Sequence, residues 1–94
     1  MIIRPEAEAD LFDARDWYER QRNGLGREFL LCVEEVIERI RRTPEMYAVT
    51  YRDVRRALIR RFPYAIYYRI EVTEVVVLSI LHTRRDPREW QSRI

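Results

Sequence analysis

The chain contains no lysine. All 18 of its basic residues are arginine, and they stand against 16 acidic residues and a single histidine. Codon bias in a GC-rich genome explains an all-arginine composition without any functional cause. Arginine still has chemical consequences, because its guanidinium stays charged and pairs well with phosphate and carboxylate groups.

Cysteine, glycine and proline are also scarce. The single cysteine, Cys32, excludes an internal disulfide, indicates a reducing compartment and is expected to be a buried packing residue. Two glycines and four prolines exclude collagen-like and linker-like chains. No uncharged apolar run approaches the ~20 residues that span a bilayer, and the N-terminal residues lack an apolar signal region. These features predict a cytoplasmic protein with no membrane partner.

The chain contains enough hydrophobic and aromatic residues to form a folded domain. Hydrophobic residues make up 47% of the 94, and six Tyr, three Phe and two Trp exclude a disordered chain. The length predicts one domain over residues 1–94, with a thin core.

Charge is unevenly distributed along the chain. Residues 1–47 hold 8 arginines and 11 acids, a net charge of −3, whereas residues 48–94 hold 10 arginines and 5 acids, a net charge of +5. A basic C-terminal half on a small domain indicates an anionic partner, either nucleic acid or an acidic protein. Composition does not distinguish the two.

The first half of the sequence has the periodicity of two helices. Residues 2–4 predict a short strand, after which apolar residues at spacings of three and four predict a helix over about 6–22. The glycine-containing stretch 23–26 ends that helix, and a second helix with a wide apolar face follows over about 26–42. So short a link makes the pair an antiparallel helical hairpin.

The second half has strand periodicity. Side chains of residues 64–71 alternate between the two faces of a strand. One face, expected to contact the hairpin, carries Tyr64, Ile66, Tyr68 and Ile70. Residues 75–81 are nearly all apolar, which predicts a strand covered on both faces or covered by a partner. A third strand is predicted over 54–62, and a short helix from Asp86. The fold class is therefore α+β, with a helical hairpin on an antiparallel sheet.

No common catalytic or cofactor motif is present. Gly24-Leu25-Gly26 is too short for a phosphate-binding loop and follows a helix rather than a strand. One histidine and one cysteine, fifty residues apart, do not furnish a zinc site. We therefore expect neither a cofactor nor a bound metal.

The candidate site is the segment after the last predicted strand, which we call the exit loop (residues 82–87). His82 can carry a proton near neutral pH, and Arg84 and Arg85 can hold a phosphate or a carboxylate. The alternative is that His82 caps the strand while the arginines are solvated or pair with Asp86. On a strand over 54–62, Arg56 and Arg60 would share one face and Arg55 and Arg61 the other. Surface solubility is the usual explanation for such a group of basic residues, which here consists of Arg52, Arg55, Arg56, Arg60 and Arg61.

Several short motifs together resemble the RelE/ParE superfamily of type II toxin–antitoxin toxins. The resemblance spans about residues 2–90 and rests on the order and spacing of these motifs: Asp10-Leu11, Ala14, Trp17-Tyr18, Gly24-Leu25-Gly26 with Phe29, Tyr47, Arg61-Phe62-Pro63-Tyr64, Ile66-Tyr67-Tyr68, Val75-Val76-Val77-Leu78 and Ile80-Leu81-His82-Thr83-Arg84-Arg85-Asp86-Pro87. It implies the fold just described, a cognate antitoxin partner, growth inhibition and plasmid stabilisation.

The resemblance leaves the target open. ParE-like members inhibit DNA gyrase, whereas RelE-like members cleave mRNA on the ribosome. An arginine that RelE-like members often carry is replaced here by Ala65, and their catalytic lysines are absent, so the chain is closer to ParE-like members. The resemblance then implies a target-binding surface of His82, Arg84, Arg85 and Arg61. If the chain is a ribonuclease instead, His82, Arg85 and Arg61 would be catalytic. A non-toxic remnant that binds only its antitoxin is the third alternative.

Overall fold

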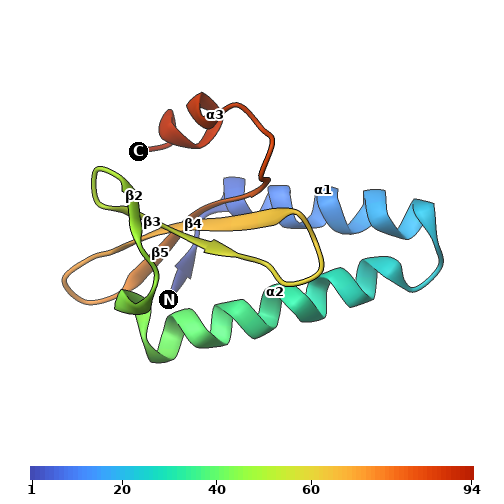
Figure 1. Cartoon of the computed structure of the whole chain (residues 1–94), viewed down its shortest axis with the longest axis horizontal. Helices are drawn as coiled ribbons and strands as arrows, with labels where there is room; N and C mark the ends of the chain where they lie inside the picture. The colour runs from blue at the N-terminus through green and yellow to red at the C-terminus, as the bar shows by residue number, and fades with distance from the viewer.

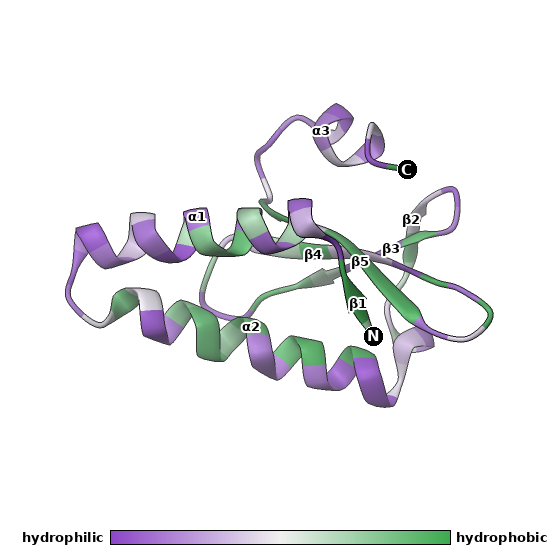
Figure 2. Ribbon diagram, turned by 180° about the vertical axis from the view of Figure 1, so that it is seen from behind, coloured by the Kyte–Doolittle hydropathy of each residue, from purple (hydrophilic) through white to green (hydrophobic).

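The helical hairpin of the protein consists of α1 (Pro5–Gln21) and α2 (Leu25–Arg42). In the computed structural model, which describes residues 1–94, the two helices run antiparallel along one side of the sheet (Figure 1). Pro5 begins α1, where its missing N–H leaves no hydrogen bond unmade. The hydropathy colouring in Figure 2 shows apolar residues recurring along α2, which is the more amphipathic helix. The predicted hairpin is confirmed.

The turn of the hairpin depends on glycine and on one carboxylate. Gly24 adopts a φ of 87°, a left-handed conformation that favours glycine. A Cβ on Gly26 would lie 2.7 Å from the carbonyl oxygen of Arg15, so only glycine lets α2 approach α1 this closely. The carboxylate of Glu19 accepts hydrogen bonds from the backbone N–H groups of Gly24 and Gly26, both at 3.0 Å. Glu19 thus satisfies donors that the start of α2 leaves free.

The sheet has five strands in the order β1-β5-β4-β3-β2. The three predicted sequential strands, β3, β4 and β5, pair antiparallel as expected, and β2 extends this antiparallel series beside β3. β1 adds a parallel pair with β5 at one edge, so the sheet is mixed. The strands have these bounds: β1 Ile2–Ile3, β2 Val49–Tyr51, β3 Val54–Leu58, β4 Tyr64–Ile70 and β5 Val75–His82.

The two faces of the sheet bury separate apolar clusters. On the hairpin face, Ile66 and Tyr68 of β4 pack with α2 residues such as Phe29 and Val33, and Cys32 is buried there as expected. On the opposite face, which we call the outer face, Tyr67 lies under Trp90 of α3 (Pro87–Gln91). Figure 1 shows α3 on the side of the sheet away from α2. Of the two alternatives for β5, the one in which the chain itself covers both faces is confirmed.

A bulge interrupts the pairing of β4 with β5. Tyr67 lies opposite Ser79, but the next residue, Tyr68, lies opposite Val77. The extra residue, Leu78, gives β5 two consecutive residues against one on β4. Leu78 joins the outer-face cluster, while Val77 and Ile80 contact the hairpin.

Two strand predictions need correction. The strand predicted over 54–62 ends at Leu58, because the chain turns there: Arg61 has a φ of 73° and Pro63 follows. Arg60 and Arg61 therefore lie in a turn and do not alternate along a strand. The short strand β2 was not predicted, since its three residues are too few to show a period. The 3-10 turn at Pro44–Met46 precedes β2. No helix of the protein has both the length and the apolarity needed to cross a membrane.

Candidate functional site

The exit loop begins at the last residue of β5. His82 is partly buried, and its ring lies edge-on to Tyr64 with the ring centres 5.4 Å apart. The backbone N–H of Arg84 donates to Nδ1 of His82 at 3.0 Å. Since Nδ1 accepts this bond, the hydrogen-bond network assigns the proton of the neutral ring to Nε2. His82 thus both ends the strand and shapes the loop that follows.

The exit loop ends at the start of α3. Asp86 caps α3 by accepting a hydrogen bond from the backbone N–H of Arg88 at 3.0 Å. The side chain of Arg88 also binds the Asp86 carboxylate and holds its pKa below the ordinary value. Asp86 therefore pairs with Arg88, and the alternative in which Asp86 pairs with Arg84 or Arg85 is wrong.

The two loop arginines differ in their surroundings. Arg85 pairs with Glu89 of α3 at 2.8 Å, an exposed pair. The side chain of Arg84 is exposed and forms no ion pair. Arg84 is therefore the loop guanidinium with its full hydrogen-bonding capacity free for a partner.

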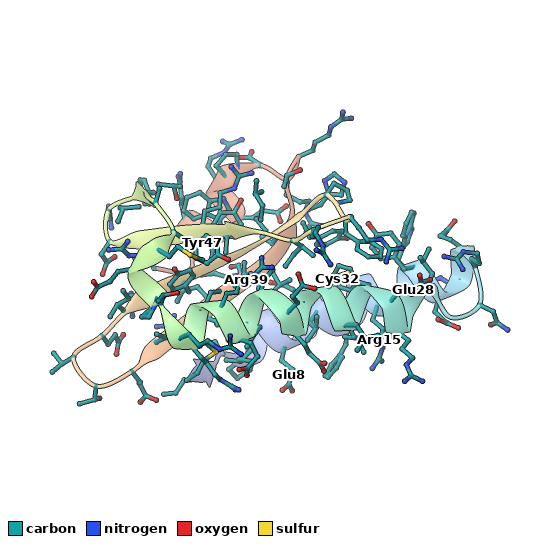
Figure 3. All side chains as sticks on the ribbon, turned by 60° about the horizontal axis from the view of Figure 1, so that its bottom comes forward. Glu8, Arg15, Glu28, Cys32, Arg39 and Tyr47 are labelled. Carbon is teal, nitrogen blue, oxygen red and sulfur yellow. The ribbon has the colours of Figure 1, made fainter.

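Arg61, in the turn between β3 and β4, does not line a groove with the other predicted site residues. Its guanidinium pairs with Glu28 at 3.3 Å, and Arg22 binds the same carboxylate at 2.7 Å. The two arginines together lower the pKa of the exposed Glu28 carboxyl. Figure 3 shows Glu28 near the turn of the hairpin. The structure thus brings His82 and Arg85 together and places Arg61 on a separate ion-pair network.

A groove of about 390 Å³ runs between α1 and the start of the exit loop. His82, Arg85 and Tyr64 line one side, and burial raises the pKa of the Tyr64 hydroxyl. The α1 side carries residues that were not among the predicted site residues: Asp10, Asp13, Asp16, Trp17 and Arg20. The acids recur every three residues, a spacing that places them on one side of a helix and was available in the sequence.

A second groove, of about 420 Å³, is mainly apolar. It lies between the two helices and β1, and its floor includes Ile3, Leu30, Val33 and Ile80. Charged residues of α2 line it as well: Glu34, Glu38 and Arg41. An apolar floor with a charged rim is typical of a surface that receives an amphipathic segment.

The groove is lined by one histidine and by carboxylates of α1. No three His, Cys, Asp or Glu side chains are close enough to hold a metal ion. His82 is the one histidine, and its Nδ1 is engaged within the loop. The geometry suits binding through charge and shape, with the basic loop and the acidic side of α1 facing each other.

The class of protein follows from a match to a toxin family of the RelE/ParE superfamily. The family model described as "ParE toxin of type II toxin-antitoxin system, parDE" matches residues 1–87. The chain therefore belongs to the ParE toxin family.

Two relatives agree with this assignment. The chain is 27% identical over 88 residues to Toxin ParE2 of Mycobacterium tuberculosis H37Rv, covering 93% of this chain and 84% of that protein. The same identity and coverage hold for Toxin ParE2 of strain CDC 1551 / Oshkosh. A solved structure described as the chromosomal ParDE TA system from P. aeruginosa has a similar fold, with a TM-score of 0.63 at 20% identity. That similarity covers 87% of this chain and 95% of the other.

Proposed function

We propose that this ParE-family toxin acts in the cytoplasm by binding and inhibiting DNA gyrase, and that a cognate antitoxin neutralises it. The observation that carries the proposal is the family match, which includes the exit loop within residues 1–87. In that loop the free guanidinium of Arg84 stands beside Arg85 and His82. A basic surface of this kind speeds the encounter with an acidic partner and fixes its orientation.

Binding without chemistry fits these surroundings better than RNA cleavage does. Position 65, where RelE-like members often carry an arginine, is a fully buried alanine in the outer-face cluster with Trp90. Arg61 is held by Glu28 and does not line the groove with His82 and Arg85. In this arrangement Arg61 binds Glu28 instead of joining the other two groups in the groove, which supports the gyrase-binding alternative.

The apolar groove between the helices is the surface we assign to the antitoxin. Ile3 is 37% exposed at its edge, and Leu30 and Val33 lie within it. The antitoxin segment would fold on binding, with its apolar side on the groove and its polar side toward Glu34 and Arg41.

The proposal is tested by expressing the chain with and without the small gene that neighbours it. Growth arrest relieved by the neighbour, together with loss of plasmid supercoiling in the arrested cells, is the expected result. Cleavage of mRNA with normal supercoiling would replace gyrase by the ribosome as the target. Normal growth without the neighbour, combined with binding to its product, would identify a non-toxic remnant.

A further inference from the structure

We propose that the outer face of the sheet holds an anion-binding site for a phosphate group, centred on Arg56. This site is separate from the exposed surface of the exit loop and goes beyond the proposed function. It is a pocket of about 220 Å³ between the outer face and α3, and it shares Thr83, Arg85 and Pro87 with the loop.

Strand pairing places Arg56 in this pocket. Arg56 of β3 lies opposite Tyr67 of β4, so both side chains point to the outer face. Tyr67 stacks on Trp90 with the ring centres 4.4 Å apart and the planes 14° from parallel. These rings form an apolar wall beside the guanidinium, which weakens competition from water for any anion bound there.

Arg56 lacks the partners that a partly buried arginine normally has. Its Nε is buried with no hydrogen-bond partner, the one such side-chain atom in the protein. Arg56 also forms no ion pair, although arginines close to it along the chain do: Arg60 pairs with Glu35 and Arg61 with Glu28. A buried donor left unsatisfied costs free energy, so its presence points to a missing acceptor.

The other groups that line the pocket suit an oxyanion. Arg85 supplies a second guanidinium and Thr83 a hydroxyl group, and no carboxylate lines the pocket. The hydroxyl of Thr50 also lines it and at present donates to the carbonyl oxygen of Val54 at 3.4 Å. Guanidinium groups bind the oxygens of phosphate through pairs of charge-assisted hydrogen bonds, and hydroxyl groups donate to the remaining oxygens. Arg85 can turn toward the pocket at small cost, because its present pair with Glu89 is exposed.

The test observes the arginine Nε–H groups of the full-length protein by ¹⁵N NMR while inorganic phosphate is added. Adenosine 5′-monophosphate is titrated in parallel, and sodium chloride is added to keep the ionic strength constant. We expect the Nε–H signal of Arg56 to shift saturably with phosphate. Tighter binding of the nucleotide would identify a nucleotide as the source of the phosphate group, and equal or weaker binding would identify free phosphate.

Variants make the result specific. Arg56→Gln should weaken phosphate binding about tenfold or more, since hydrogen bonds to charged groups are lost. Arg60→Gln is the matched control, because it removes the same charge from an exposed arginine close by in the chain and should leave binding unchanged. No saturable shift at Arg56 in the wild-type protein, or an equal loss of binding in both folded variants, would overturn the proposal.

Discussion

The carboxylate of Asp10 and the guanidinium of Arg93 form a two-point ion pair between residues 83 positions apart. Nη2 of Arg93 donates to Oδ1 of Asp10 at 3.1 Å, and Nη1 donates both to Oδ2 and to the Ser79 hydroxyl, the latter at 2.9 Å. Asp10 in turn accepts from the backbone N–H of Ile80 at 3.1 Å, on the part of β5 beyond the end of β1. The pair therefore connects α1 to two segments of the chain. These are the end of β5, which precedes the exit loop, and the C-terminal residues, which follow it.

Asp10→Ala should destabilise the protein by about 2 kcal/mol or more. The change leaves the Arg93 charge without its partner and the Ile80 N–H without its acceptor, and both groups are shielded from water. The side chains of Asp10 and Arg93 are only 11% and 23% exposed. Urea denaturation followed by circular dichroism measures the change in the free energy of unfolding.

Asp13→Ala is the matched control for Asp10→Ala. Asp13 lies on the same helix, is exposed and forms no ion pair, so its loss should change the free energy of unfolding by less than about 0.5 kcal/mol. Equal effects of the two substitutions would show that the Asp10–Arg93 pair contributes nothing particular.

Ile66→Asp should prevent folding. Ile66 is fully buried on the hairpin face, and an unpaired charge placed there costs several kcal/mol, a large part of the stability of a domain this small. Leu58→Asp, on the neighbouring strand, is the control, because Leu58 is 58% exposed and the new charge remains in water. A stable Ile66→Asp variant with native circular dichroism would mean that the contacts of this strand face are assigned incorrectly.

The face of β4 was predictable because the strand is long enough to show its period. Ile66 and Tyr68 on the hairpin face alternate with Ala65 and Tyr67 on the outer face. The buried faces of the helices were predictable for the same reason, because apolar residues repeat at helical spacing. The early end of β3 depends on the positive φ of Arg61, a conformation that an arginine in a sequence does not signal.

The candidate site was predictable only in part. The exit loop was found because its basic residues are adjacent in the sequence. Contacts between residues far apart in the sequence were missed. Asp10 and Arg93 are an acid and a base, but their residue types do not show that the two side chains meet in the fold. The position of Arg61 on Glu28 is another such contact, because it depends on how the β3–β4 turn meets the hairpin.

The stability of the protein should fall between about pH 10 and pH 12 partly through Tyr68. Burial is the main cause that raises the pKa of Tyr68 from 10.0 to about 12, and its hydroxyl donates to the carbonyl oxygen of Pro44. Because the folded state has the higher pKa, the contribution of Tyr68 is complete below pH 10. It is lost as the pH rises through the folded-state pKa of about 12.

Tyr68→Phe separates this contribution from general alkaline denaturation. The variant should be less stable at neutral pH by about 1 kcal/mol, the net value of a hydrogen bond, and less sensitive to pH above 10. Urea denaturation of both proteins at several pH values gives the comparison. Parallel losses of stability in the two proteins would contradict the assigned role of Tyr68.

His82→Gln distinguishes binding from catalysis. A glutamine carbonyl can still accept a hydrogen bond, as Nδ1 now does from the N–H of Arg84, so a protein that only binds gyrase should lose little toxicity. A ribonuclease that uses His82 for proton transfer should lose about 10²–10⁴-fold in rate. Growth arrest at matched expression levels provides the measurement, and near-complete loss of toxicity in the folded variant would contradict the binding mechanism.

Inhibition of gyrase by the exit loop is measured on the supercoiling of relaxed plasmid DNA by purified gyrase. We predict that the wild-type protein blocks supercoiling and that Arg84→Glu combined with Arg85→Glu loses most of this inhibition while keeping its native circular dichroism. Arg41→Glu combined with Arg42→Glu is the control, with the same change of charge on exposed residues at the end of α2. Undisturbed supercoiling with the wild-type protein, or equal inhibition by the folded exit-loop variant, would contradict the account.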